Sequence, residues 1–209
     1  MPNLARIACI CQKKAVTLQP KMDNEQKTSY LTIEAKAEGL YKDKGSRFLA
    51  FAEPVCSEEQ VRERLAFYRK TYHDARHVCF AYKLGEQARS SDDGEPSGTA
   101  GKPIMGRIES AGLDRILIVV VRYFGGILLG TGGLVVAYRE ASADAIAHAK
   151  IIERDIISTR TLQFGYEQMH EVMRLIKETD ARILRQDWDG SNCEMEIEVG
   201  VRYADRFVK

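Results

Sequence analysis

The chain has 209 residues, which is enough for one large domain or two small ones. Its hydrophobic content of 44% and charged content of 29% fit a globular protein and argue against wholesale disorder. The net charge is only +1, so binding to nucleic acid would need a local basic patch. The longest apolar run, residues 116–121, is far shorter than the roughly 20 residues of a membrane helix, so no membrane association is expected.

The first 21 residues carry four basic groups and no acidic group. Their apolar piece is interrupted by Arg6, is too short for a secretory signal and precedes no small-residue cleavage site. We therefore predict that residues 1–21 are a leader, either disordered or an upstream extension. The five cysteines, an odd number without paired C-x-x-C spacing, indicate idle thiols in a reducing, cytoplasmic setting rather than zinc ligands.

Strands and helices are mixed over residues 22–155. Strands are predicted over residues 30–36, 46–55, 77–84 and 115–122. Helices are predicted from residue 57, over residues 104–111 and over residues 134–149, with a polar loop over residues 85–103. Ser57 and Gln60 form a capping box for the first helix. The strand at 115–122 is apolar on both faces, which is typical of a central buried strand. The core stripe of the last helix is Leu134, Tyr138, Ala141 and Ala145.

Residues 161–209 show a second pattern of predicted strands and helices. Strands are predicted over residues 161–166, 181–187 and 193–201, and a helix over residues 167–179 with Met169, Val172, Met173 and Ile176 facing inward. The order β-α-β-β begins a ferredoxin-like unit, which also needs a second helix and a fourth strand. The chain ends at Lys209, where that helix would begin, so we expect this domain to be short or incomplete.

Ten of the sixteen glycines lie between Gly94 and Gly133. Such a density needs a geometric reason, because glycine loses more backbone entropy on folding than other residues. Five of them stand between a buried strand and a helix: Gly125, Gly126, Gly130, Gly132 and Gly133. A turn of this kind exposes backbone N–H groups at the positive end of the helix dipole and could bind an anion. The spacing matches neither a phosphate-loop motif nor G-x-G-x-x-G, so a tight turn with glycines for packing is an equal alternative.

Arg122 and Tyr123 end the buried strand just before these glycines. The arginine could hold a phosphate through two hydrogen bonds, and the tyrosine could stack on a base. The alternative is that Arg122 pairs with a carboxylate of the nearby acidic loop and that Tyr123 packs at the edge of the core.

The acidic loop concentrates Asp92, Asp93 and Glu95 within four residues. Three carboxylates could bind a divalent cation or share a proton. However, D-D-G-E is not a calcium-loop pattern and turns favour Asp and Gly, so a solvated turn, or one locked by a basic side chain, is the preferred interpretation. Lys102, a few residues downstream, could contact an anion or be an ordinary loop lysine.

His77 and Cys79 are two residues apart on one predicted strand, so their side chains share a face and could form a catalytic pair. A cysteine nucleophile needs a helix end or a cation to stabilise its thiolate, and a strand interior rarely supplies either. A half-buried histidine beside a core cysteine is therefore preferred. No strong catalytic signature is present, so the residues by themselves identify no enzyme, metal site or cofactor.

Four segments together resemble one family. They are K-G-S-R-F (44–48), A-R-H-V-C-F-A-Y (75–82), D-D-G-E-P-S-G-T-A-G-K-P-I-M (92–105) and V-V-V-R-Y-F-G-G-I-L-L-G-T-G-G-L-V-V-A-Y-R-E-A (119–141). This combination resembles the YigZ/IMPACT family over about residues 44–150, and the weaker pattern at 161–201 resembles the smaller C-terminal domain of its bacterial members.

The resemblance implies an α+β protein of two domains. The N-terminal domain, residues 22–155, is expected to be similar to domain IV of elongation factor G and to a domain of a small-subunit ribosomal protein. The C-terminal domain, residues 160–209, is expected to be the β-α-β-β portion of a ferredoxin-like fold. No oligomeric state is implied.

The resemblance also implies a non-enzymatic, cytoplasmic protein that binds RNA or the ribosome and regulates translation. The alternatives are a small-anion- or nucleotide-binding protein or hydrolase that uses the acidic loop and the glycine turn, and a protein-interaction module of a translation regulator. Binding of nucleic acid or another anion is expected at Arg47, His77, Thr99, Lys102, Arg122, Tyr123, Gly125, Gly126, Gly130, Gly132 and Gly133. Many relatives carry Lys at the position of Leu128 and Arg at that of Val136, so this turn has fewer flanking cations.

Overall fold

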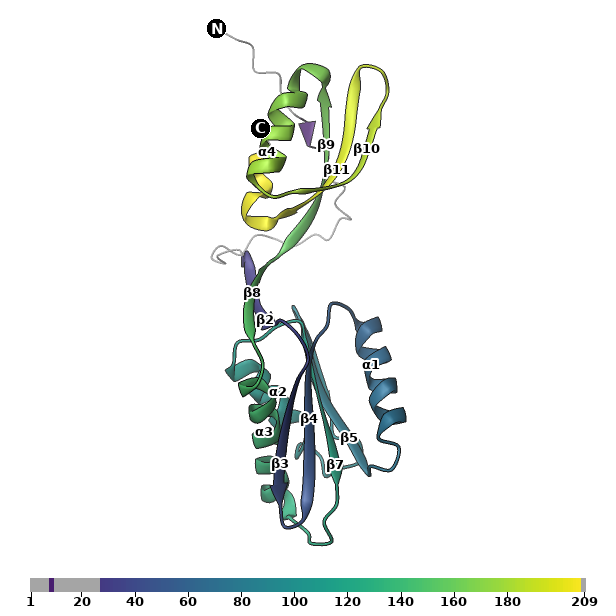
Figure 1. Ribbon diagram of the computed structural model, residues 1–209, viewed down its shortest axis with the longest axis vertical. Coiled ribbons are helices and arrows are strands. Elements are labelled where there is room, and N and C mark those ends of the chain that lie inside the picture. The colour runs from purple at the N-terminus through teal and green to yellow at the C-terminus, as the bar shows by residue number, and fades with distance from the viewer. Residues whose placement is uncertain (1–7, 10–26, 208–209) are drawn as a thin grey trace, which may run out of the picture. The chain divides into compact units, whose positions relative to one another are not determined.

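The computed structural model describes residues 8–9 and 27–207, and the chain divides into two compact units (Figure 1). The larger unit is Leu31–Arg154, and the smaller unit combines Asp155–Lys209 with Met1–Tyr30. The division after Arg154 lies next to the boundary that the sequence predicts at residues 155–160. The mixture of helices and strands confirms the predicted α+β class.

The larger unit is built on a five-stranded antiparallel sheet in the order β3-β4-β7-β5-β6. Its strands are β3 (Ala37–Asp43), β4 (Ser46–Pro54), β5 (His77–Leu84), β6 (Gln87–Ser91) and β7 (Ile116–Tyr123). Helices α2 (Gly101–Ser110) and α3 (Gly130–Ala147) cover one face, and α1 (Glu58–Thr71) covers part of the other (Figure 1).

The centre of the sheet is β7, as its apolar sequence predicts. Every side chain from Ile116 to Val121 is fully buried, because β7 lies between β4 and β5 and has helices on both faces. One face packs against the predicted stripe of α3, and all four residues of that stripe are buried. Burying each large apolar side chain contributes roughly 1.5–3 kcal/mol, so this strand is the main anchor of the unit.

The N-terminus of α1 is capped by Ser57 and Gln60, the two residues that the sequence predicts. The Ser57 hydroxyl accepts a hydrogen bond from the backbone N–H of Gln60 at 3.3 Å, as expected for an N-cap. The Gln60 side chain accepts one from the backbone N–H of Cys56 at 2.8 Å. It therefore reaches one residue further than in the predicted capping box.

Three strands differ from the prediction. The strand expected over residues 30–36 ends early as β2 (Ser29–Ile33), which pairs with β8 (Ile151–Asp155) in a separate two-stranded sheet. The chain then forms a new strand, β3, which the sequence pattern does not predict. Strand β6 lies inside the predicted polar loop, because an exposed edge strand shows no alternation of apolar and polar residues.

Helix α3 begins at Gly130, four residues before the predicted start at residue 134. Gly130, Gly132 and Gly133 therefore form the first turn of the helix and do not precede it. Glycine disfavours helix by about 1 kcal/mol relative to alanine, so a propensity argument places the start too late. Packing of the following stripe against the sheet overrides that local preference.

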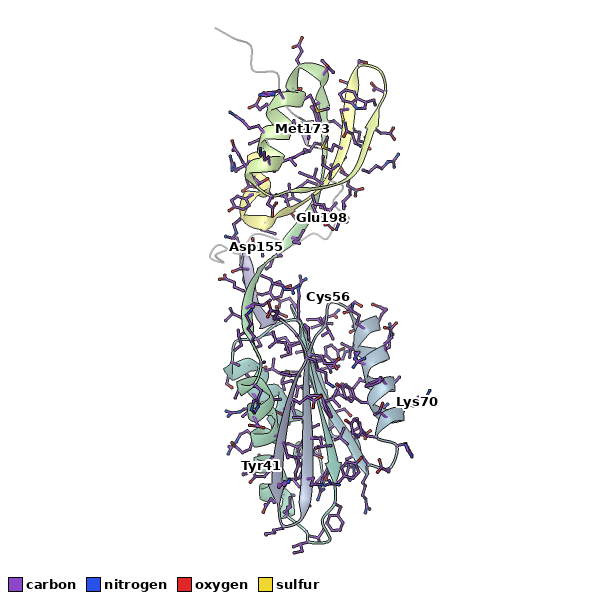
Figure 2. All side chains as sticks on the ribbon, in the orientation of Figure 1. Tyr41, Cys56, Lys70, Asp155, Met173 and Glu198 are labelled. Carbon is purple, nitrogen blue, oxygen red and sulfur yellow. The ribbon has the colours of Figure 1, made fainter. Side chains whose placement is uncertain are left out.

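The smaller unit has a four-stranded antiparallel sheet in the order β1-β9-β11-β10. Its elements are β1 (Ala8–Cys9), β9 (Ile157–Gly165), α4 (Met169–Glu178), β10 (Arg182–Trp188) and β11 (Asn192–Gly200), with short 3-10 helices at Tyr166–Gln168 and Val201–Phe207. Its core is made by one face of the sheet with α4 and the last 3-10 helix. Met173 was predicted to face inward but is 42% exposed on α4 (Figure 2).

Strand β1 comes from the predicted leader. Ala8 and Cys9 pair antiparallel with Gln163 and Leu162, beside the first strand of the β-α-β-β unit. This is the edge at which a ferredoxin-like unit carries its fourth strand. These two residues are therefore not disordered, which was one of the two alternatives for the leader, and the rest of residues 1–21 lies outside the described part of the chain.

Candidate functional site

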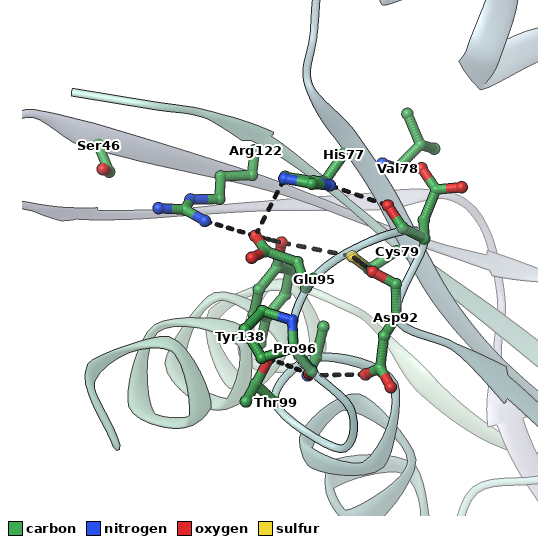
Figure 3. A network of polar contacts seen from close by, with 12 residues as sticks. Ser46, His77, Val78, Cys79, Asp92, Glu95, Pro96, Thr99, Arg122 and Tyr138 are labelled. Atoms are coloured by element: carbon green, nitrogen blue, oxygen red, sulfur yellow. Dashed lines mark hydrogen bonds and ion pairs between the residues drawn. The ribbon is translucent and has the colours of Figure 1, made fainter. Parts of the chain in front are cut away.

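One end of the larger sheet gathers most of the predicted site residues. Strand β5 begins at His77, β7 ends at Tyr123 and β4 begins at Ser46. The antiparallel register places Arg122 opposite His77 on one side and opposite Phe48 on the other. The acidic loop and the glycine turn both adjoin this end, so segments far apart in the sequence meet there (Figure 3).

A buried polar network centres on Glu95 (Figure 3). Arg122 Nη1 donates to Glu95 Oε1 at 2.6 Å, and the Tyr138 hydroxyl donates to the same oxygen at 2.8 Å. The side chains of Glu95 and Arg122 are only 3% and 8% exposed. We call Glu95, Arg122, Tyr138, His77 and Cys79 the Glu95 network. Arg122 thus pairs with a carboxylate of the acidic loop, as one of the two alternatives for this residue predicts.

His77 holds the acidic loop against the sheet. Its Nδ1 lies 2.8 Å from the carbonyl oxygen of Asp93. A carbonyl oxygen can only accept, so Nδ1 carries the proton in this arrangement. The other ring nitrogen, Nε2, then faces Glu95 Oε1 at 3.9 Å.

Cys79 is a core thiol and not a nucleophile. It is fully buried, and its Sγ lies 3.3 Å from the Tyr138 hydroxyl and 3.0 Å from the Asp92 carbonyl oxygen. Burial raises the pKa of the Cys79 thiol to about 12, so the thiolate that catalysis requires is absent at neutral pH. Burial also raises the pKa of the Tyr138 hydroxyl. The His77–Cys79 pair is therefore structural.

The carboxylates of the acidic loop are occupied by the fold. Asp92 accepts hydrogen bonds from the backbone N–H groups of Gly98, Ala100 and Gly101, at 2.8, 3.0 and 2.8 Å, and so caps the start of α2. Burial alone would raise the pKa of Asp92, but these three hydrogen bonds outweigh it and leave that pKa below its ordinary value. Asp93 accepts from the backbone N–H of Val78 at 2.7 Å.

The loop is therefore a turn locked by hydrogen bonds to the backbone. Among the residues that the structure describes, no group of three or more His, Cys, Asp or Glu side chains is placed to hold a metal ion. Thr99 is buried and its hydroxyl donates to the Pro96 carbonyl oxygen at 2.6 Å, which also serves the loop. Lys102 is exposed on the first turn of α2.

The five predicted glycines divide by physical role. A Cβ at Gly125 would lie 2.0 Å from the carbonyl carbon of Gly45, so this glycine allows two backbones to touch. Gly126 and Gly130 have φ angles of +88° and +72°, in the left-handed region that glycine adopts without strain. A Cβ at Gly133 would lie close to the Leu129 side chain. A Cβ at Gly132 would meet open space, so close packing does not explain the glycine at that position.

Tyr123 and Arg47 lie on the opposite face of the sheet from Arg122, because successive residues of a strand alternate. The Arg47 guanidinium lies 5.1 Å from the centre of the Tyr123 ring, and the Tyr123 hydroxyl donates to Asp74 Oδ1 at 2.9 Å. Lys42 is paired with Arg47 across the β3–β4 hairpin, so Lys42, Arg47 and Tyr123 form one row across three strands. With Lys44 in the turn, we call them the hairpin surface.

Comparison with known proteins identifies the family. A family model described as the Impact N-terminal domain matches residues 44–146. The chain is 36% identical over 165 residues to the IMPACT family member YigZ of Escherichia coli strain K12, covering 77% of this chain and 81% of the relative. The chain belongs to the IMPACT family. The family member YvyE of Bacillus subtilis strain 168 is 31% identical over 182 residues, 86% of this chain and 83% of that one.

A solved structure extends the likeness of this IMPACT family chain to both units. A crystal structure of a hypothetical protein superposes with a TM-score of 0.71 at 32% identity, covering 87% of this chain and 90% of the other. The family model includes every residue of the Glu95 network and most of the hairpin surface. In the described part of the chain, no helix combines the length and apolar character needed to cross a membrane.

Sequence reasoning missed two parts of this site. The sequence predicts Tyr138 only as a core residue of its helix. A buried tyrosine hydroxyl usually has a hydrogen-bond partner, and the need for one could have suggested a contact with the acidic loop. Lys42 and Lys44 are not among the predicted binding residues, because the alignment of Lys42 with Arg47 depends on the register of a hairpin whose first strand is not predicted. Leu128 and Val136 beside the glycine turn are exposed.

Proposed function

We propose that this protein is a non-enzymatic regulator of translation that binds RNA, free or in the ribosome, through its hairpin surface. Membership of the IMPACT family supports the link to translation, as the sequence resemblance implies. The observation that carries the RNA-binding part is the row Lys42–Arg47–Tyr123 at the end of the sheet, extended by Lys44.

The chemistry of the hairpin surface suits an RNA backbone with unstacked bases. Its three cations are exposed and can contact phosphates, while the half-buried Tyr123 ring can contribute stacking. The hydrogen bond from Tyr123 to Asp74 holds the ring in place. Helix α1 packs over β5 and β7, so the outer face of β3 stays accessible, with Leu40 45% exposed beside Lys42. A local patch of this kind makes RNA binding compatible with a net charge of +1.

The test is co-sedimentation of the full chain with ribosomes, and binding to structured RNA, at several salt concentrations. We expect Lys44→Ala/Arg47→Ala to weaken binding and to reduce the slope of log affinity against log salt by roughly 1–2, because two phosphate contacts are lost. The matched control is Arg62→Ala/Arg89→Ala, which removes two exposed cations that pair with Glu59 and Glu58 near the other end of the sheet.

Absence of binding at low salt, or equal loss in both double variants, would contradict the proposal. The protein-interaction alternative makes a different prediction, since capture of a protein partner would survive nuclease treatment. RNA binding would not.

A further inference from the structure

A pocket of about 420 Å³ opens beside the Glu95 network, on the face of the sheet that carries α3. Arg122, His77 and Glu95 form its polar floor, and Thr131 lies on the first turn of α3. The apolar walls are Pro96, Phe124, Leu128, Leu129 and Leu134. Its volume is within the range of small-ligand pockets in proteins, and the mixture of apolar walls with a few convergent polar groups is typical of them.

Arg122, one of the residues that line the pocket, has a buried donor without a partner among the described residues. Arg122 Nε is buried and has no hydrogen-bond partner among the described residues, although Nη1 of the same guanidinium is held by Glu95. Buried polar atoms are rarely left without a partner, because the loss of hydration is not compensated. An arginine that lines a pocket and retains an unused donor indicates a site where a ligand can supply an acceptor.

The charge around the pocket favours an anion. Arg122 and Arg76 are the cations that line it, and Glu95 is the one acid among the lining residues. The Glu95 carboxylate already accepts hydrogen bonds from Arg122 and Tyr138, and these donors compensate its negative charge. The first turn of α3 has no acidic residue and no side-chain cap, so its backbone N–H groups add donors at the positive end of the helix. A guanidinium, a hydroxyl and the start of a helix around one pocket are the kinds of donor that bind the terminal oxygens of a phosphate.

We propose that this pocket binds a phosphate monoester with an apolar or aromatic body, of the size of a nucleoside monophosphate. The phosphate lies between Arg122, Thr131 and the start of α3, and the body lies against Phe124 and the leucines. This site is separate from the hairpin surface, because Arg122 and Tyr123 point to opposite faces of β7. The inference therefore does not depend on RNA binding.

The experiment is isothermal titration calorimetry of the full chain at low salt with adenosine 5′-monophosphate, adenosine and inorganic phosphate as probes. We expect the monophosphate to bind at least tenfold more tightly than either adenosine or inorganic phosphate, since only it uses both the donors and the walls. The decisive variant is Thr131→Asp, which places a carboxylate at the phosphate position. It is expected to weaken monophosphate binding at least tenfold.

Thr131→Asp separates binding from folding. An acidic side chain in the first turn of a helix interacts favourably with the helix dipole, so the thermal midpoint should stay unchanged or rise while binding is lost. The matched control is Arg62→Gln, which also lowers the net charge by one. The Arg62 side chain is exposed on α1, away from the pocket, so this variant should bind the monophosphate as the parent does.

Three outcomes would overturn the inference: no monophosphate binding at millimolar concentration, equal affinity for inorganic phosphate, or undiminished binding by Thr131→Asp. RNA binding is tested by different variants. Monophosphate binding that persists in Lys44→Ala/Arg47→Ala would support the pocket whether or not the hairpin surface binds RNA.

Discussion

Arg122 carries its charge beside Glu95 in a place where both side chains are almost sealed from water. Such a pair is tolerated because each charge is compensated by the other, with Tyr138 adding a second hydrogen bond to Glu95. Together with Tyr138, the pair joins three parts of the chain: β7, the acidic loop and α3. Arg122 therefore stabilises the site, and a substitution of Arg122 is expected to change the stability of the fold as well as any ligand binding.

The first prediction concerns this pair. Arg122→Ala should lower the free energy of unfolding by about 3–5 kcal/mol, because it leaves the Glu95 carboxylate buried without a countercharge. Urea unfolding followed by circular dichroism measures the change. Arg122→Met/Glu95→Leu should recover most of the loss, and exposed Arg62→Ala should stay within about 0.5 kcal/mol of the parent. A double variant no more stable than Arg122→Ala would show that the pair is not the cause.

Asp92 makes stability depend on pH in the acidic range. Its folded-state pKa lies below the ordinary 3.8, so the folded protein favours the charged carboxylate more than the unfolded chain does. The resulting stabilisation is present above the ordinary pKa and is lost as the pH falls through the lower, folded-state value.

The second prediction tests this dependence of stability on the charge of Asp92. Asp92→Asn should destabilise the protein by about 1–2 kcal/mol at pH 7, since a charged cap of α2 becomes a weaker, neutral one. The difference in unfolding free energy between Asp92→Asn and the parent should shrink below about pH 4. Denaturant melts at pH 7 and pH 3 measure it. A difference that is constant across this range would argue against a charged cap.

At the scale of elements, the turn from β7 into α3 combines two backbone requirements. Gly125 lets the turn touch the β3–β4 hairpin, and its N–H donates to the Ser46 hydroxyl at 3.1 Å. Gly132, seven residues later, lies on the exposed first turn of the helix with open space around it. The same residue type thus has opposite consequences for stability at the two positions.

The third prediction compares these two glycines. Gly125→Ala should destabilise the larger unit by about 1–3 kcal/mol, because the new methyl group would overlap backbone atoms that cannot move independently. Gly132→Ala should be neutral or stabilise by up to about 1 kcal/mol, because alanine favours helix. Thermal melts of the two variants give the comparison. Equal effects at both positions would contradict the packing role of Gly125.

At the scale of the whole molecule, the two units have separate cores. The clusters on the two faces of the larger sheet draw only on residues within Leu31–Arg154, and the third cluster draws only on the smaller unit. Each unit therefore buries enough apolar surface within itself to be considered a separate folding unit.

The fourth prediction is that a fragment of residues 28–155, which retains both β2 and β8, folds alone. It should show native-like far-ultraviolet circular dichroism and one cooperative urea transition, because both of its clusters are intact. A fragment spanning residues 156–209 without the N-terminal residues would lack β1 and should be the less stable of the two. Loss of cooperative unfolding in the first fragment would show that its core is incomplete.

Several features of this protein follow from local residue pattern alone. The apolar run of β7, the stripe of α3 and the β-α-β-β order are each written in residues close together in the chain, so periodicity predicts them. The four matching segments were likewise enough to indicate the family. The sequence also offered the pairing of Arg122 with the acidic loop as one of two alternatives, but residue types could not choose between them.

The contacts that these residues make could not be predicted in the same way, because they depend on how the chain folds. Antiparallel register placed His77, Arg122 and Phe48 side by side, and the alternation of a strand sent Arg122 and Tyr123 to opposite faces. Helix α3 brought Tyr138 to Glu95, 43 residues away in sequence. Edge strands such as β3 and β6 were missed for a different reason: each pairs with its neighbour in sequence through a hairpin, but neither shows the apolar–polar alternation that identifies a half-buried strand. The contacts between segments far apart in sequence depend on chain topology, which local residue patterns do not encode.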